Sequence, residues 1–89
     1  MEKEKFLLEA LGNRIRDIRI NNLLLSQRAM AINCGLITHH LSLIETGKKR
    51  INIITLRKIA VVCHMSLSEL LDFDLWTPDE MHFPKGERF

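Results

Sequence analysis

The sequence predicts a single all-α domain built from five short helices. The chain has 89 residues, which is enough for one compact domain and too few for two independent cores. Hydrophobic residues make up 46% of it and charged residues 27%, the proportions of an ordinary globular protein rather than a disordered one. Apolar residues recur at helical spacing along most of the chain, and residues that begin or end helices separate these stretches.

The first helix is predicted from an apolar face with the spacing of an amphipathic helix. That face consists of Leu8, Leu11, Ile15 and Ile18. The helix is expected to end near Asn21 and Asn22, because asparagine tolerates the left-handed conformation that closes helices. Two of its arginines, Arg14 and Arg16, fall off the apolar face, and we expect them to be solvated or near a phosphate.

The second and third helices are bounded by clear start and stop residues. Ser26 can cap a short helix over Gln27 to Cys34, and Gly35 can take the positive φ that ends it. After a tight turn, a helical apolar pattern runs through roughly Thr38 to Glu45, and Gly47 ends it.

Two further helices follow. Asn52 is a candidate cap for a fourth helix with an inward face of Leu56, Ile59, Ala60 and Cys63. His64 closes that helix, where glycine would be usual. Ser66 and Glu69 have the spacing of a capping box, which opens a fifth helix that is expected to reach about Phe73.

The charges are unevenly distributed along the chain. The formal net charge is only +2, but residues 1 to 68 carry +6 and residues 69 to 84 carry −5. A basic body joined to an acidic segment indicates an anionic partner for the body.

The second and third predicted helices fit a helix-turn-helix, in which two helices are joined by a short turn with a glycine. Ala31 is the small residue needed where the helices cross, and Gly35 lies in the turn. The positions that must be buried are apolar: Met30, Cys34, Leu36, Leu41 and Ile44. The second helix of this motif enters the major groove of DNA.

On these residues the chain resembles the lambda-repressor-like helix-turn-helix family, also called Cro/C1-type or XRE. The resemblance runs from about Leu11 to Leu71 and is carried by the stretches LGNRIRDIR, LSQRAMAINCGL, LSLIETGKKR and TLRKIAVVCHMSLSELL. It implies a five-helix bundle that binds operator DNA as a homodimer, on a roughly palindromic site, and regulates transcription as a repressor.

The resemblance also implies roles for single residues. Gln27 matches a residue that meets a phosphate and braces the recognition helix, and Arg19 and Glu45 match a buried ion pair. The groove-facing positions are occupied by Thr38, His39, Ser42, Leu43 and Thr46. Their hydroxyl, imidazole and methyl groups can contact base edges. The expected phosphate contacts are Arg28, Lys48, Lys49 and Arg50.

Three features of the sequence depart from the family pattern or stay open. Ile37 replaces the usual Ser or Thr cap of the recognition helix, which forfeits about 1 kcal/mol, and it could meet a thymine methyl instead. Leu23 to Leu25 stand where one glycine is commoner, and the connection is one residue longer than usual. His40 could reach a phosphate or pack beside the turn.

Other classes of function find little support in the sequence. Cys34 and Cys63 are too few for a disulfide framework and are expected to be core thiols, with no acid–base partner for catalysis. The histidines and cysteines lack the spacing of a metal site, so we predict no metal, no cofactor and no enzyme activity. No apolar run approaches the roughly 20 residues of a membrane span, and no secretory signal is present, so we expect a cytoplasmic protein.

We divide the chain into a DNA-binding domain, residues 1 to 73, and a C-terminal extension, residues 74 to 89. The extension is acidic and contains large apolar residues: Leu75, Trp76, Met81, Phe83 and Phe89. Two hypotheses fit them, packing back on the domain or forming an interface. The alternative functions are an antitoxin, whose extension docks a basic toxin-like enzyme, and a controller of a restriction system or a phage-type repressor.

Overall fold

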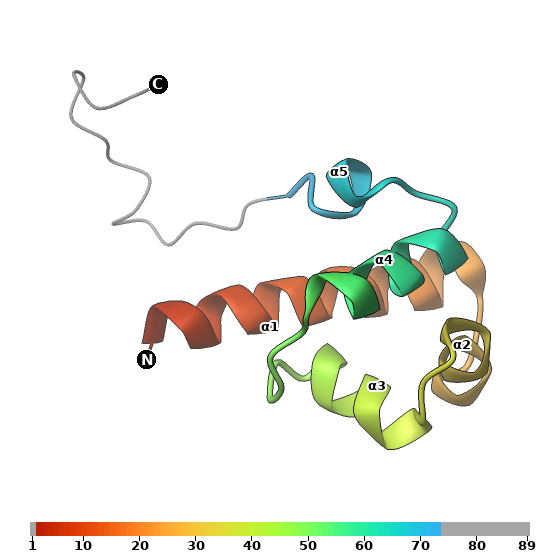
Figure 1. Ribbon diagram of the computed structural model, residues 1–89, viewed down its shortest axis with the longest axis horizontal. Coiled ribbons are helices and arrows are strands. Elements are labelled where there is room, and N and C mark those ends of the chain that lie inside the picture. Colours follow the sequence, from red (N-terminus) through yellow and green to blue (C-terminus); the bar gives the residue numbers. More distant parts are fainter. Residues whose placement is uncertain (1, 74–89) are drawn as a thin grey trace.

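The computed structural model of the chain describes residues 2 to 73, and all regular structure in that range is helical (Figure 1). Helix α1, Glu2–Asp17, runs directly into a π-helical segment, Ile18–Leu23. Three helices follow: α2, Gln27–Cys34; α3, Thr38–Glu45; and α4, Ile53–Val62. A single-turn helix, α5, Leu67–Leu70, completes this part. The predicted all-α bundle is confirmed; residues 74 to 89, and with them the predicted extension, lie outside the described range.

Figure 1 shows α1 as the long axis of the bundle, with α2 and α3 on one side of it and α5 on the other. Helix α3 packs against α1 and α2, and α4 packs against α2 and α5. The largest fully buried side chains come from five different helices: Ile15, Met30, Leu41, Ile59 and Leu70. The predicted inward face of α4 is buried throughout. Leu11 and Ile15 of α1 and Ile18 of the π-helical segment are buried as predicted, whereas Leu8, also predicted for this face, is half-buried. The apolar spacing in the sequence therefore marked the core correctly.

The helix starts and the helix-turn-helix turn also match the prediction. Ser26 Oγ accepts from the Ala29 N–H at 3.1 Å, and Asn52 Oδ1 accepts from the Thr55 N–H at 2.8 Å. The capping box of α5 is complete, with Ser66 Oγ accepting from Glu69 N and Glu69 Oε1 accepting from Ser66 N. Gly35 adopts a φ of 71°, which lets the chain turn sharply between α2 and α3.

The end of the first helix differs from the prediction. Instead of closing at Asn21 or Asn22, the helix continues as a π-helix to Leu23, and Leu24 takes the left-handed conformation with a φ of 55°. The Leu24 and Leu25 N–H groups both donate to the Arg19 carbonyl. Leu23 and Leu25 pack against the core, so the chain must reverse at the residue between them. A π-helix has wider turns, which take up the extra residue of this connection.

Replacing Leu24 with glycine is expected to raise the free energy of unfolding by about 1 kcal/mol, because the left-handed conformation costs an L-residue about 1–2 kcal/mol. Little packing is lost, since the Leu24 side chain is 81% exposed. The measurement is urea denaturation of the two proteins. Asn22→Gly is the control: Asn22 is also exposed but helical, so glycine there should destabilise by about 0.5 kcal/mol. A loss of stability in Leu24→Gly would contradict this account of the turn.

Helix α5 is shorter than predicted, because an arginine from α1 binds the carbonyls at its end. Arg14 Nη2 donates to the Glu69 carbonyl at 2.9 Å and Arg14 Nε to the Leu70 carbonyl at 3.2 Å. Its guanidinium also lies 5.9 Å from the centre of the Phe73 ring. The expectation that Arg14 is solvated or near a phosphate is therefore wrong; it holds α5 to α1. The prediction that His64 ends α4 in place of a glycine is confirmed, because His64 takes the left-handed conformation with a φ of 58°.

Candidate nucleic-acid interface

Helix α3 turns one side to the core and leaves the other uncovered. Leu41, Ile44 and Glu45 are buried. The other positions are wholly or partly accessible, with Ile37, Thr38, His39 and Thr46 exposed and His40, Ser42 and Leu43 half-buried. The five residues predicted to face the groove therefore lie on the accessible side. Ile37 precedes the helix without a side-chain cap, as expected, and is 71% exposed.

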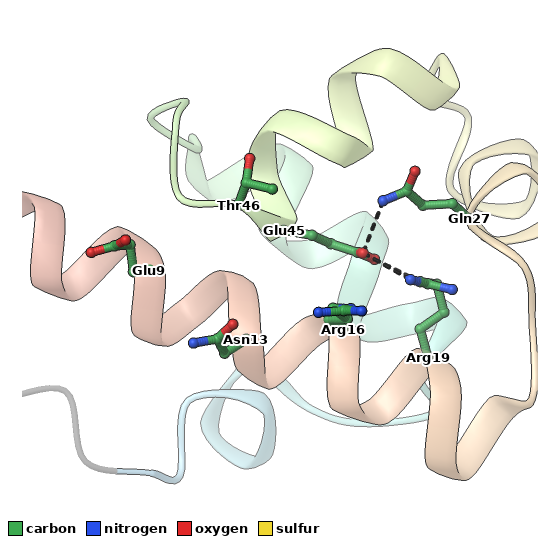
Figure 2. Close-up of a pocket in the computed structure, with 7 residues that line it drawn as sticks. All are labelled: Glu9, Asn13, Arg16, Arg19, Gln27, Glu45 and Thr46. Atoms are coloured by element: carbon green, nitrogen blue, oxygen red, sulfur yellow. Dashed lines mark hydrogen bonds and ion pairs between the residues drawn. The ribbon is translucent and has the colours of Figure 1, made fainter.

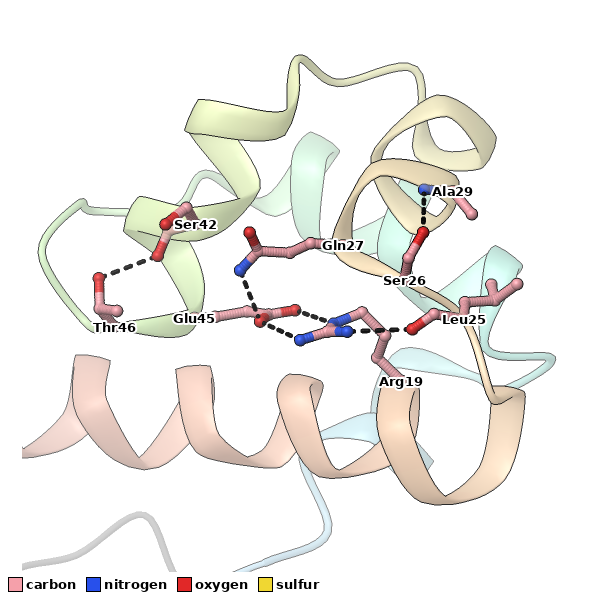
Figure 3. A network of polar contacts seen from close by, with 8 residues as sticks. All are labelled: Arg19, Leu25, Ser26, Gln27, Ala29, Ser42, Glu45 and Thr46. Atoms are coloured by element: carbon pink, nitrogen blue, oxygen red, sulfur yellow. Dashed lines mark hydrogen bonds and ion pairs between the residues drawn. The ribbon is translucent and has the colours of Figure 1, made fainter.

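A buried ion pair fixes the C-terminal end of α3 against the π-helical segment that continues α1 (Figure 3). Arg19 Nε donates to Glu45 Oε2 at 2.7 Å, and Arg19 Nη2 donates to Glu45 Oε1 at 3.0 Å. The remaining Arg19 nitrogen, Nη1, donates to the Leu25 carbonyl at 3.0 Å. Side-chain exposure is 10% for Arg19 and 2% for Glu45. The predicted pair is present in the bidentate geometry that fixes orientation most strongly.

Gln27, the first residue of α2, joins this network. Its Nε2 donates to Glu45 Oε1 at 3.0 Å, while the amide oxygen points away from the carboxylate (Figure 3). One contact thus ties the N-terminal end of α2 to the C-terminal end of α3. The bracing part of the predicted Gln27 role is accounted for by this hydrogen bond.

A polar hollow lies beside the network, between α1, α2 and the end of α3 (Figure 2). Its lining includes Glu9, Asn13 and Arg16 from α1 and Thr46 from the end of α3. The Thr46 hydroxyl donates to the Ser42 carbonyl at 2.9 Å, so only its lone pairs remain, and these can accept from a base N–H but cannot bind a phosphate oxygen. Arg16 is exposed on the rim, which agrees with the expectation for it.

The sequence interpretation missed Gly12, where α1 meets α3. A Cβ atom on Gly12 would lie 2.4 Å from the Ile44 carbonyl oxygen and 2.6 Å from that of Glu45. Gly47 makes a similar close approach, because a Cβ there would lie 2.6 Å from Glu9 Cγ. The two glycines let the end of α3 lie directly on the α1 backbone. A glycine inside a helical pattern is the signal that could have indicated this approach.

The basic loop after α3 is exposed at Lys48, Lys49 and Arg50. Arg50 Nη2 lies 2.8 Å from Glu4 Oε2 of α1. Both side chains are well exposed, at 82% and 54%, so this pair is weak and open to competition from another anion. Arg28 is exposed on the first turn of α2.

Both cysteines are buried, as expected of core thiols. Burial and the neighbouring Cys63 raise the pKa of Cys34 to about 11, and burial raises the pKa of Cys63 as well. Almost no thiolate is then present at neutral pH, which leaves neither sulfur suited to nucleophilic attack. Among residues 2 to 73 no cluster of His, Cys, Asp and Glu is arranged to hold a metal ion, and no helix there is long and apolar enough to cross a bilayer.

The comparisons with known proteins agree with this geometry. The chain is 31% identical over 62 residues to the control protein C.BamHI of Bacillus amyloliquefaciens, a match that covers 70% of this chain and 76% of that protein. No protein-family model and no solved structure matches the chain. The helix-turn-helix, the buried ion pair and this similarity identify the chain as a member of the Cro/C1-type (XRE) helix-turn-helix family of DNA-binding transcription regulators.

Proposed function

We propose that the protein binds operator DNA with α3 in the major groove and represses transcription from nearby promoters. The observation that supports the proposal is that α3 has one side held in the protein by polar contacts and another side open to solvent. Glu45, with Arg19 and Gln27, fixes the helix from its buried side, while its other side remains accessible. A recognition helix needs this combination, because bases are read only by side chains that a rigid support holds in register.

The accessible residues of α3 suit contacts to base edges. His39 can donate to the acceptor edge of guanine, and the hydroxyl of Thr38 or Ser42 can bond to either kind of base. Leu43 and Ile37 offer methyl groups to the methyl of thymine. Bidentate readers such as Arg, Asn and Gln are missing from this set, so part of the specificity is assigned to DNA shape.

Phosphate contacts are assigned to residues on either side of α3. Lys48, Lys49 and Arg50 lie in the loop that follows it, and Arg28 lies on α2. The free amide oxygen of Gln27 cannot bind a phosphate oxygen, so a phosphate contact of Gln27 would use its Nε2, shared with Glu45, or its backbone N–H. These contacts are independent of sequence and supply affinity that falls with salt.

A two-fold dimer is part of the proposal, because family members of this kind read two half-sites with two recognition helices. Three apolar side chains on α4 are each more than half exposed: Ile53, Ile54 and Val61. A second copy of the chain would remove them from water. Sedimentation of the free protein and of its DNA complex tests this part.

Replacing Lys49 with alanine is expected to weaken DNA binding for all sequences alike. The slope of log affinity against log salt should fall by about 1, the contribution of one phosphate contact. Titrations of a duplex at several salt concentrations measure it. Lys58→Ala removes the same charge from α4, outside the assigned contacts, and should change the slope by clearly less. Equal slopes for Lys49→Ala and the unmodified protein would contradict the assignment.

Replacing His39 with alanine is expected to change which sequences are preferred. A lost base contact costs about 1–3 kcal/mol at one position of the site and little elsewhere. Binding to a panel of single base-pair variants of the preferred duplex measures this loss. His64→Ala serves as the histidine control, because His64 lies beyond α4. A uniform loss over the whole panel would assign His39 to the backbone instead.

A further inference from the structure

The N-terminal half of α1 carries an apolar strip that the described helices leave partly uncovered. Phe6 and Leu7 are 39% and 40% exposed, and Ala10 is half-buried. Phe6, Ala10 and Arg14 are spaced four residues apart, and Leu7 is seven residues from Arg14, so all four lie on one side of the helix. In Figure 1 the first turns of α1 extend past the beginning of α4, which leaves this part of α1 with fewer neighbours.

Next to the strip is a hollow of about 240 Å³ between α1 and the loop that leads into α4. Leu7, Leu8 and Ile51 form its apolar lining, and the exposed Glu4–Arg50 ion pair lies at its edge. A large apolar side chain with an acidic neighbour would suit this surface, because the ring could cover the leucines while the carboxylate met Arg50.

The described part of the chain ends beside the same strip. Phe73 lies over the Arg14 guanidinium, and Arg14 also binds the last carbonyls of α5. Phe73, the last described residue, therefore lies about two turns of α1 away from Leu7, which lines the hollow. Residues 74 to 89 include four acids, two bases and the single tryptophan of the chain, Trp76.

We propose that the segment 74 to 89 docks along α1 and that the Trp76 side chain occupies the hollow beside Leu7. The distances agree: three residues from Phe73 to Trp76 span up to about 10 Å, and α1 rises about 10 Å between Arg14 and Leu7. The charges agree as well, since the segment carries more acids than bases and the exposed Arg50 lies at the edge of the hollow.

Tethering favours this segment over a second copy of the chain as the occupant. A short link gives a local concentration in the millimolar range, far above that of a separate molecule in dilute solution. Tryptophan also buries a large area at a small cost in conformational entropy, so one side chain can hold the segment in place.

Trp76 fluorescence tests the docking directly, because the chain has one tryptophan and no tyrosine. In the full chain we expect emission at shorter wavelength than in urea, and weaker quenching by acrylamide. Both signals should stay constant on dilution to concentrations at which sedimentation detects only monomer. A fully exposed emission would overturn the proposal. Loss of the blue shift on dilution would overturn it too, since a second copy would then be the occupant.

Variants locate the contact on α1. Leu7→Ala should move the emission toward the exposed value and increase quenching, while Ile20→Ala, which removes a side chain of similar exposure (42%) from the π-helical segment, should change neither. Ile51→Ala changes the opposite wall of the hollow and should act like Leu7→Ala. Circular dichroism confirms that each variant is folded. Unchanged fluorescence in folded Leu7→Ala and Ile51→Ala would place Trp76 elsewhere and overturn the proposal.

Discussion

Replacing Gly12 with alanine is expected to lower the free energy of unfolding by about 2 kcal/mol, although alanine is the better helix former. The added Cβ would lie 2.4 Å from the Ile44 carbonyl oxygen and 2.6 Å from that of Glu45. Both are backbone atoms, so no side chain can rotate away and α1 must separate from α3. The overlap costs up to about 3 kcal/mol, which the better helix propensity offsets by about 1 kcal/mol.

Urea denaturation measures this loss, and Asn13→Ala is the matched control. Asn13 is the next residue of the same helix and is exposed, so its replacement should change stability by less than about 0.5 kcal/mol. DNA affinity should fall in Gly12→Ala as well, because the displaced end of α3 belongs to the recognition helix. A Gly12→Ala protein as stable as the unmodified one would show that α1 and α3 are not in such close contact.

Replacing Glu45 with alanine is expected to cost about 3–5 kcal/mol, because it leaves a buried arginine without its charge partner. Arg19 would keep only the Leu25 carbonyl, and Gln27 would lose its acceptor. A domain of this size has a total stability of about 5–10 kcal/mol, so much of the protein would be unfolded at moderate temperature. Thermal and urea denaturation followed by circular dichroism measure the effect.

Two comparisons make this result specific to the buried pair. Glu4→Ala breaks the exposed pair with Arg50 and should cost less than about 1 kcal/mol. The double replacement Arg19→Met with Glu45→Met removes both charges and should recover most of the lost stability, because no unpaired ion remains buried. DNA binding should not recover with it, since α3 would have lost its polar fixation. Similar costs for Glu4→Ala and Glu45→Ala would contradict the account.

The parts of the fold that were predicted correctly depend on residues that are close together in the sequence. The side chains of Ser26, Asn52 and Ser66 each accept a hydrogen bond from the N–H three residues later, and Gly35 is needed for its own positive φ. Both features can therefore be predicted from a few neighbouring residues. The apolar spacing of α4 likewise needs no knowledge of what it packs against. These features are confirmed as predicted.

The parts that were missed depend on contacts between distant residues. Arg14 ends α5 through a hydrogen bond that spans 55 residues of sequence, and Gly12 is needed because α3 lies against it. The π-helical end of α1 arises because both Leu23 and Leu25 reach the core. Spacing along one helix cannot show any of these contacts, since each is set by the position of a second element.

In the candidate site, the contacts within the protein are confirmed and the contacts with DNA stay predictions. The family resemblance predicted an ion pair between Arg19 and Glu45, and this pair is confirmed, with bidentate geometry. The predicted bracing contact of Gln27 is confirmed as well. The base and phosphate contacts of α3 and its loop stay predictions, because they depend on DNA. Their accessibility is consistent with the roles proposed for them.

The most direct test of the central claim, that α3 reads operator DNA, is a selection of bound sequences from random duplexes. We expect enrichment of an inverted repeat whose half-sites are about 10 base pairs apart from centre to centre. The same selection with His39→Ala should lose preference at one position of each half-site. Recovery of no enriched sequence, with the protein folded and at low salt, would contradict the claim.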